Sequence, residues 1–219
     1  MKKPMFSLTT GKAPVNRRFW RLFAAKICKP GKLPAAALLL VLLLVLFLVY
    51  SCSAKAQGSS PADTAKIFAE AGIPLLKEKV SGRNFTLPLA SPEGETQSLD
   101  SLKGKVVFLN FWATWCGPCR SEMPSMEVLY NKYKDQGLDI LAVNCMENRA
   151  DVVSFLTNNK LSFPAVLDTG GDVSRSYGIQ AIPTTFIIDR EGKITIRLVG
   201  SINWDTPKIH AAMERLLSE

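Results

Sequence analysis

Metal-binding side chains are scarce in this sequence of 219 residues, which has one histidine, His210, and five cysteines. A structural zinc site needs four ligands, usually cysteines and histidines. One pair of cysteines, Cys116 and Cys119, has the C-x-x-C spacing, and the other three lie singly along the chain. We therefore expect neither a metal site nor a cofactor.

Basic charge is also scarce over most of the chain. The net charge of +8 arises from residues 1–32, which hold nine lysines and arginines and no acidic residue. The remaining residues hold 18 basic and 19 acidic side chains. A nucleic-acid-binding domain carries a basic patch, so we expect no nucleic-acid partner. The sequence lacks internal repeats and long low-complexity tracts, which favours a single folded domain.

An uncharged apolar segment, residues 33–54, follows the basic region. Basic residues before such a segment place the N-terminus in the cytoplasm and the next domain outside it. Three fates remain open: retention as a membrane anchor, lipidation of Cys52 after cleavage, and release by signal cleavage near residues 54–56. The unbroken apolar core spans about 22 Å as a helix, so an anchor needs its flanking residues to cross a hydrocarbon layer of roughly 30 Å. Each fate places the domain on the extracytoplasmic side, in the periplasm or cell envelope.

The remaining sequence alternates apolar runs with helix-like stretches. The first strands alternate with helices, and the last two are separated by a turn-forming segment, which predicts an α/β fold. We expect a central mixed β-sheet with helices on both faces. The predicted strands are 105–111, 138–143, 163–167, 184–188 and 194–199, and the predicted helices are 63–71, 118–136, 150–158, 173–177 and 205–217. The predicted organisation is a basic cytoplasmic region (1–32), a signal, anchor or lipoprotein segment (33–54), a linker with a short helix (55–82) and the folded domain (83–219).

The C-x-x-C pair lies between a predicted strand and a predicted helix. The first amides of a helix lack internal partners and carry partial positive charge, so a thiolate at Cys116 is stabilised there. This lowers the pKa of the Cys116 thiol below the usual value of about 8.5, and only the thiolate attacks a disulfide. Cys119, one helical turn later, is then the resolving thiol, and Pro118 suits the first helical position. Metal binding and inert packing are the weaker alternatives.

Residues 111–120 closely resemble the active-site segment of the thioredoxin superfamily, and most of all its TlpA-like, redoxin-type branch. That branch consists of membrane-tethered extracytoplasmic thiol–disulfide oxidoreductases. Pro124 matches the proline that kinks the active-site helix, and residues 182–186 match the segment with a cis proline facing the dithiol. Residues 85–104 look like the N-terminal β-hairpin and short helix that this branch adds. The resemblance covers residues 83–218 and implies a thioredoxin-like fold with a hairpin extension.

The resemblance implies a redox-active Cys116–Cys119 disulfide and a third catalytic residue. Thioredoxin has a buried aspartate at the position that Asn110 occupies here, and asparagine cannot titrate. TlpA-like proteins instead carry a glutamate three residues after the second cysteine, which is Glu122 in this chain. On a helix Glu122 lies near Cys119, where it can assist proton transfer. The alternative is a solvated glutamate in the first helical turn.

The same resemblance implies a substrate-binding surface around the dithiol. Its expected members are Trp115, Gly117, Pro118, Ile182 and Pro183. Ile182 and Pro183, joined by a cis peptide bond, are expected to hold the main chain of the partner and to keep metals from the sulfurs.

Three other side chains receive simpler interpretations. Cys145, at the end of a predicted strand, is expected to be a small buried side chain, with a redox role as the minor alternative. Trp112 is expected in the core or beside the site, and His210 at the surface or as a helix-capping residue.

The resulting hypothesis is a protein-disulfide reductase that acts as a monomer. The resemblance implies protein disulfides as substrates, with apocytochrome c among them, and a membrane thiol donor that recharges the enzyme. A peroxiredoxin-like thiol peroxidase is one alternative, but that branch has threonine three residues before its cysteine, and Thr114 lies two before Cys116. A copper-carrying binding module is the other, but it uses C-x-x-x-C with a distant histidine, and His210 is the sole candidate.

We predict that Cys116 in the reduced protein is alkylated by iodoacetamide faster than glutathione at neutral pH. The reason is its larger thiolate fraction at the start of a helix. Mass spectrometry of the alkylated peptide over time measures the rate. A rate equal to that of glutathione would contradict the assignment of Cys116 as the nucleophile.

Overall fold

The computed structural model describes residues 61–73, 75–91 and 95–219, which belong to one compact unit, Ser59–Glu219. None of the helices in these three ranges combines the length and apolar character needed to cross a membrane. The basic region (1–32), the apolar segment (33–54) and the candidate lipidation site Cys52 lie outside the described residues. Their interpretation therefore stays a prediction.

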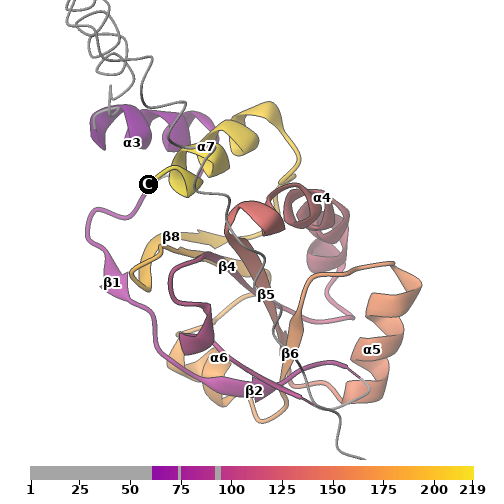
Figure 1. The fold of residues 1–219 in the computed structure, drawn as a ribbon. Coiled ribbons are helices and arrows are strands. Elements are labelled where there is room, and N and C mark those ends of the chain that lie inside the picture. The colour runs from indigo at the N-terminus through magenta and orange to yellow at the C-terminus, as the bar shows by residue number, and fades with distance from the viewer. Residues whose placement is uncertain (1–60, 74, 92–94) are drawn as a thin grey trace, which may run out of the picture. The chain divides into compact units, whose positions relative to one another are not determined.

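A mixed six-stranded sheet forms the centre of the unit, in the order β1-β8-β7-β4-β5-β6 (Figure 1). Strands β4, β5 and β6 are parallel, whereas β7 runs antiparallel to β4 and pairs with β8 as a hairpin. A separate hairpin consists of β2 (Thr86–Pro88) and β3 (Thr96–Ser98). The sheet strands are β1 (Val80–Ser81), β4 (Val106–Trp112), β5 (Leu138–Cys145), β6 (Ala165–Asp168), β7 (Thr184–Ile188) and β8 (Lys193–Val199).

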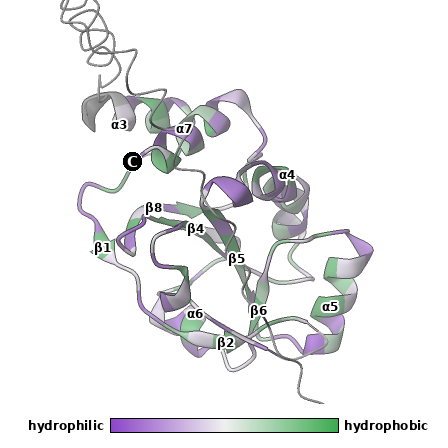
Figure 2. Cartoon of the chain, in the orientation of Figure 1, coloured by the Kyte–Doolittle hydropathy of each residue, from purple (hydrophilic) through white to green (hydrophobic). Residues whose placement is uncertain are grey.

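The sheet separates two apolar layers, and strand β4 contributes to both. Phe108 and Trp112 face one layer, whereas Val107, Leu109 and Phe111 face the other, as the period of two in a strand requires. All seven residues of β4 are buried because both faces are covered. The central strands β4 and β5 are accordingly mostly hydrophobic (Figure 2).

Helices and the hairpin cover the two faces of the sheet. The first layer packs against α3 (Pro61–Glu70), α4 (Gly117–Tyr133), α5 (Arg149–Asn158) and α7 (Pro207–Leu217). The second packs against α6 (Asp172–Ser176), the 3₁₀ turn η1 (Asp100–Leu102) and the β2–β3 hairpin (Figure 1). This arrangement confirms the predicted α/β, thioredoxin-like fold with helices on both faces and an N-terminal hairpin.

The boundaries of the predicted elements shift by only a few residues. The largest difference is in the active-site helix, which was expected to continue to residue 136. Helix α4 ends at Tyr133, and a 3₁₀ turn, η2 (Lys134–Gln136), follows it. The turn ends at Gly137, whose φ of 97° lies in the left-handed region that favours glycine. The tighter last turn satisfies carbonyl groups at the helix end.

The packed part of the chain begins before the boundary predicted at residue 83. Helix α3 places Phe68 in the core beside α7, and the following Ile73 is buried there as well. Strand β1 pairs with β8, and Lys79 forms an ion pair with Asp189 at 2.8 Å. The apolar face of α3 needs such a cover, so part of the segment predicted as a linker packs against the domain.

We predict that Leu109→Ala lowers the free energy of unfolding by about 3 kcal/mol, because Leu109 is fully buried in the central strand. Urea denaturation followed by circular dichroism measures this loss. The matched control is Val128→Ala on α4, where the side chain is 45% exposed and the expected change is under ~0.5 kcal/mol. Equal losses in both variants would contradict this description of the core.

Candidate functional site

Cys116 and Cys119 form a disulfide at the start of α4, with their Cα atoms 5.3 Å apart. Cys116 is the N-cap residue of the helix, and its sulfur accepts a hydrogen bond from the backbone N–H of Cys119 at 3.2 Å. Cys116 retains 5% exposure, whereas Cys119 is fully buried. The two sulfurs therefore differ in access, and Cys116 is the outer one.

The segment before β7 lies against the outer sulfur. The Ile182–Pro183 bond is cis, as expected, and the carbonyl oxygen of Ile182 lies 3.7 Å from Cys116 Sγ. Pro183 is buried and Ile182 is half-buried. Trp115, the residue before Cys116, is 70% exposed, so its ring faces solvent.

Gly117 and Pro118, the other two expected substrate-binding residues, are exposed in the first turn of α4. Exposed apolar groups thus lie beside a disulfide whose outer sulfur belongs to a residue with 5% exposure. The chemistry available here is nucleophilic attack at sulfur, since a thiolate at Cys116 would lie at the helix start.

Glu122 is buried one turn after Cys119, which excludes the solvated glutamate considered from the sequence. Its Oε1 accepts a hydrogen bond from Asn110 Nδ2 at 3.0 Å, and its Oε2 accepts one from Trp204 Nε1 at 3.1 Å. Asn110 also donates to Thr185 Oγ1 at 2.9 Å. Burial raises the pKa of Glu122 to about 7, and the hydrogen bonds oppose that rise. Its carboxyl group therefore titrates near neutral pH.

A second glutamate, which the sequence analysis did not single out, holds the loop before the disulfide. Glu147 accepts hydrogen bonds from the backbone N–H and the hydroxyl of Thr114, the former at 2.7 Å. The same carboxylate accepts from Asn144 Nδ2 at 2.7 Å. The position of Glu147 in the sequence could have indicated this contact. Glu147 follows the carboxyl end of β5, and the neighbouring parallel strands β4 and β5 end at the same edge of the sheet.

The structure also gives the positions of Cys145, Trp112 and His210. Cys145 is buried at the end of β5, and burial raises the pKa of its thiol, which favours the protonated form. Trp112 is fully buried in the core. The surface or capping role expected for His210 is wrong: its ring is half-buried and lies 3.0 Å from Tyr133 Oη, between α7 and α4. The helix packing that encloses it depends on residues 77 positions apart, which a local pattern does not reveal.

Comparisons with known proteins agree with this geometry. Residues 77–213 match the sequence model of the Redoxin family. The thiol-disulfide oxidoreductase ResA of Bacillus subtilis (strain 168) is 41% identical over 132 residues, which cover 60% of this chain and 73% of that protein. The protein of the same name from Bacillus anthracis is 44% identical over 108 residues, covering 49% of this chain and 62% of its own length. The chain thus spans less than two thirds of several curated relatives.

Solved structures of the same fold are also similar. A crystal structure described as a thiol:disulfide interchange protein DsbE from Chlorobium tepidum has a TM-score of 0.59 and 34% identity, covering 65% of this chain and 99% of that one. The thioredoxin domain of a thiol-disulfide oxidoreductase from Bacteroides vulgatus has a TM-score of 0.56 and 27% identity, with the same coverage.

We predict that Glu122→Gln removes a pH dependence of stability in the oxidised protein. A carboxyl group with a raised pKa holds its proton more tightly when folded, so its stabilising contribution is complete below about pH 4.5 and is lost as the pH rises through 7. The variant should therefore gain about 3 kcal/mol relative to the parent between about pH 4 and about pH 8.5.

Denaturant unfolding at a series of pH values measures this difference. Glu70→Gln, which makes the same substitution at an exposed position of α3, is the matched control. A Glu122→Gln difference that stays constant with pH would show that this carboxyl group titrates normally.

Proposed function

The chain belongs to the Redoxin family, and from that premise we propose that it is a thiol–disulfide oxidoreductase that reduces protein disulfides outside the cytoplasm. The observation that carries this proposal is the Cys116–Cys119 disulfide at the start of α4, in which Cys116 keeps a slight exposure and Cys119 is fully buried. Relatives named thiol-disulfide oxidoreductases support it. The pairing of both cysteines in one short disulfide favours this activity over a thiol peroxidase.

In the first step the Cys116 thiolate attacks one sulfur of a substrate disulfide. A mixed disulfide forms between Cys116 and the substrate, and the other substrate sulfur leaves as a thiolate that takes up a proton. The N-terminus of α4 stabilises the attacking thiolate. Ile182, Pro183 and Trp115 supply the surface on which the substrate main chain is held.

In the second step Cys119 attacks the sulfur of Cys116, which releases the second substrate thiol and forms the Cys116–Cys119 disulfide. Cys119 is fully buried, so its proton needs an acceptor inside the protein. Glu122, one helical turn away with a pKa of about 7, is that acceptor in its ionised form. Two electrons have moved from the dithiol to the substrate.

The enzyme must then be reduced by an external dithiol. We assign this role to a membrane protein of the thiol-transferring type, because residues 33–54 would keep the domain at the membrane. Apocytochrome c is the proposed substrate, held by a monomeric domain in the periplasm or cell envelope. A cysteine pair that must be reduced before haem attachment has the chemistry that this site acts on.

We predict that Cys119→Ser accumulates mixed disulfides through Cys116, because the variant completes the first step and cannot resolve its product. The full chain is expressed in a bacterial cell envelope, and adducts are separated by non-reducing electrophoresis and identified by mass spectrometry. Cys116→Ser is the matched control and should form none. Equal amounts of mixed disulfide in the two variants would show that Cys116 is not the nucleophile.

A further inference from the structure

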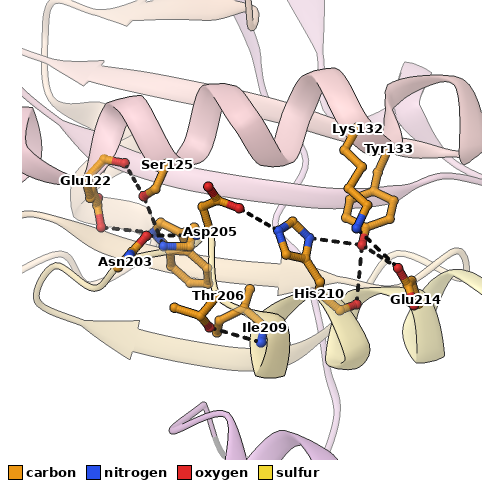
Figure 3. Close-up of polar contacts among 11 residues, drawn as sticks. Glu122, Ser125, Lys132, Tyr133, Asn203, Asp205, Thr206, Ile209, His210 and Glu214 are labelled. Atoms are coloured by element: carbon orange, nitrogen blue, oxygen red, sulfur yellow. Dashed lines mark hydrogen bonds and ion pairs between the residues drawn. The ribbon is translucent and has the colours of Figure 1, made fainter.

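The loop between β8 and α7, residues 200–206, covers the buried Glu122 carboxylate; we name it the Trp204 loop. Trp204 is fully buried, and its indole N–H donates to Glu122 Oε2 at 3.1 Å. Its backbone N–H donates to Ser125 Oγ at 3.0 Å, and that hydroxyl donates to the Glu122 carbonyl at 2.7 Å. Figure 3 shows Glu122 and Ser125 side by side on α4, facing Asn203. The loop therefore holds both the side chain and the backbone of Glu122.

Both ends of the Trp204 loop are fixed. At the first end, the backbone N–H of Gly200 donates to the Pro183 carbonyl at 2.8 Å, which joins the loop to the cis-proline segment. At the other end, Asp205 Oδ1 lies 2.7 Å from His210 Nε2 (Figure 3). His210 Nδ1 in turn contacts Tyr133 Oη on α4 at 3.0 Å. Trp204 is consequently placed by contacts of its loop to the cis-proline segment, α4 and α7.

The backbone of Ile202 also hydrogen-bonds the Glu122 carboxyl group. The two side-chain donors, Asn110 and Trp204, differ in which protonation states of Glu122 they favour. Asn110 Oδ1 is buried and has no hydrogen-bond partner within the described residues, so a rotation of this amide can present an acceptor to a protonated Glu122. The Thr185 hydroxyl can likewise donate or accept. An indole N–H only donates. Trp204 can donate to either form of the carboxyl group, but its bond to the ionised carboxylate is the stronger one because it is charge-assisted. Asn110 and Thr185 can adjust to both protonation states.

We propose that Trp204 is a positioning residue that keeps Glu122 ionised and oriented, through a loop tied to the cis-proline segment. Its part in catalysis rests on the proposed function, because an ionised Glu122 is the group that would accept the proton of Cys119. Its effect on Glu122 itself rests only on the contacts above.

Few other groups near Glu122 titrate around neutral pH. The side chains that contact its carboxyl group, Asn110 and Trp204, carry no charge, and neither does Ser125 beside its backbone. Cys116 and Cys119 are on the same helix but do not titrate while they form a disulfide. The other titratable groups of this region face His210 instead. They are Asp205, Tyr133, Glu214 and Lys132.

The test is the Trp204→Phe variant in the oxidised full-length protein. Phenylalanine keeps an aromatic ring against Phe108, whose ring centroid is 4.5 Å from that of Trp204, and removes the donor together with part of the ring volume. We expect the pKa of Glu122 to rise by about one further unit. Carbon-13 NMR of glutamate labelled at the carboxyl carbon follows this titration, and the Glu122→Gln variant assigns the signal.

Trp112→Phe is the matched control. Trp112 is equally buried, and its indole nitrogen has no hydrogen-bond partner among the described residues. This variant should leave the titration of Glu122 where it is in the parent protein. An unchanged titration in Trp204→Phe, or an equal shift in both variants, would overturn the proposal.

A measurement on the parent protein covers the case in which Trp204→Phe does not fold. The indole ¹H–¹⁵N signal of Trp204, assigned by triple-resonance NMR, should move with the Glu122 titration, and the Trp112 signal should not. The movement should vanish in Glu122→Gln. If the movement of the Trp204 signal persists in Glu122→Gln, it is caused by His210 or Asp205, and the signal does not report on Glu122.

An activity assay distinguishes a failure of this inference from a failure of the proposed function. If the parent protein reduces insulin disulfides, the pH profile of Trp204→Phe should shift upward by the same amount as the Glu122 titration, and an unshifted profile would exclude the role in catalysis. If the parent reduces no disulfide, the proposed function fails, while the titrations still decide whether Trp204 holds Glu122 ionised.

Discussion

The site depends on the burial of β4 between two apolar layers. Alternate residues of this strand face α4 and α7 on one side and the hairpin with α6 on the other, so the strand has no freedom to shift its register. The chain leaves the sheet at Trp112 and begins α4 five residues later, at Gly117. This short passage places Cys116 at the helix start, where free amide groups favour a negative charge.

Glu122 introduces a second charge into the same layer, without a cation among the side chains that contact it. Neutral donors, Asn110 and Trp204, stabilise the ionised form and offset part of the cost of burial. The balance leaves a carboxyl group that titrates near neutral pH, which a proton acceptor for a thiol requires. A lysine or arginine in place of these donors would lower the pKa of the group and hold it ionised, which would make it a poor acceptor for the proton of a thiol.

Local patterns predicted most of the fold. Strands β4 and β7 and helix α5 could be predicted from their hydrophobic patterns, because each element buries a continuous face. The dithiol was readable from its spacing, and the cis bond before Pro183 followed from the resemblance to a family. The partners of Glu122 were not readable, because Trp204 lies 82 residues further along the chain. His210 was misjudged for the same reason, since its partner Tyr133 is on another helix.

The sequence by itself determined the fold class, the dithiol and its place at a strand–helix junction, because these follow from the local order of apolar and polar residues. Only the tertiary structure decided which sulfur is accessible, that Glu122 is buried, and that the Trp204 loop joins Glu122 to the cis-proline segment. The physical reason is that burial and hydrogen bonding between distant segments arise from packing. A sequence pattern specifies which face of an element is apolar, but not which side chains meet there.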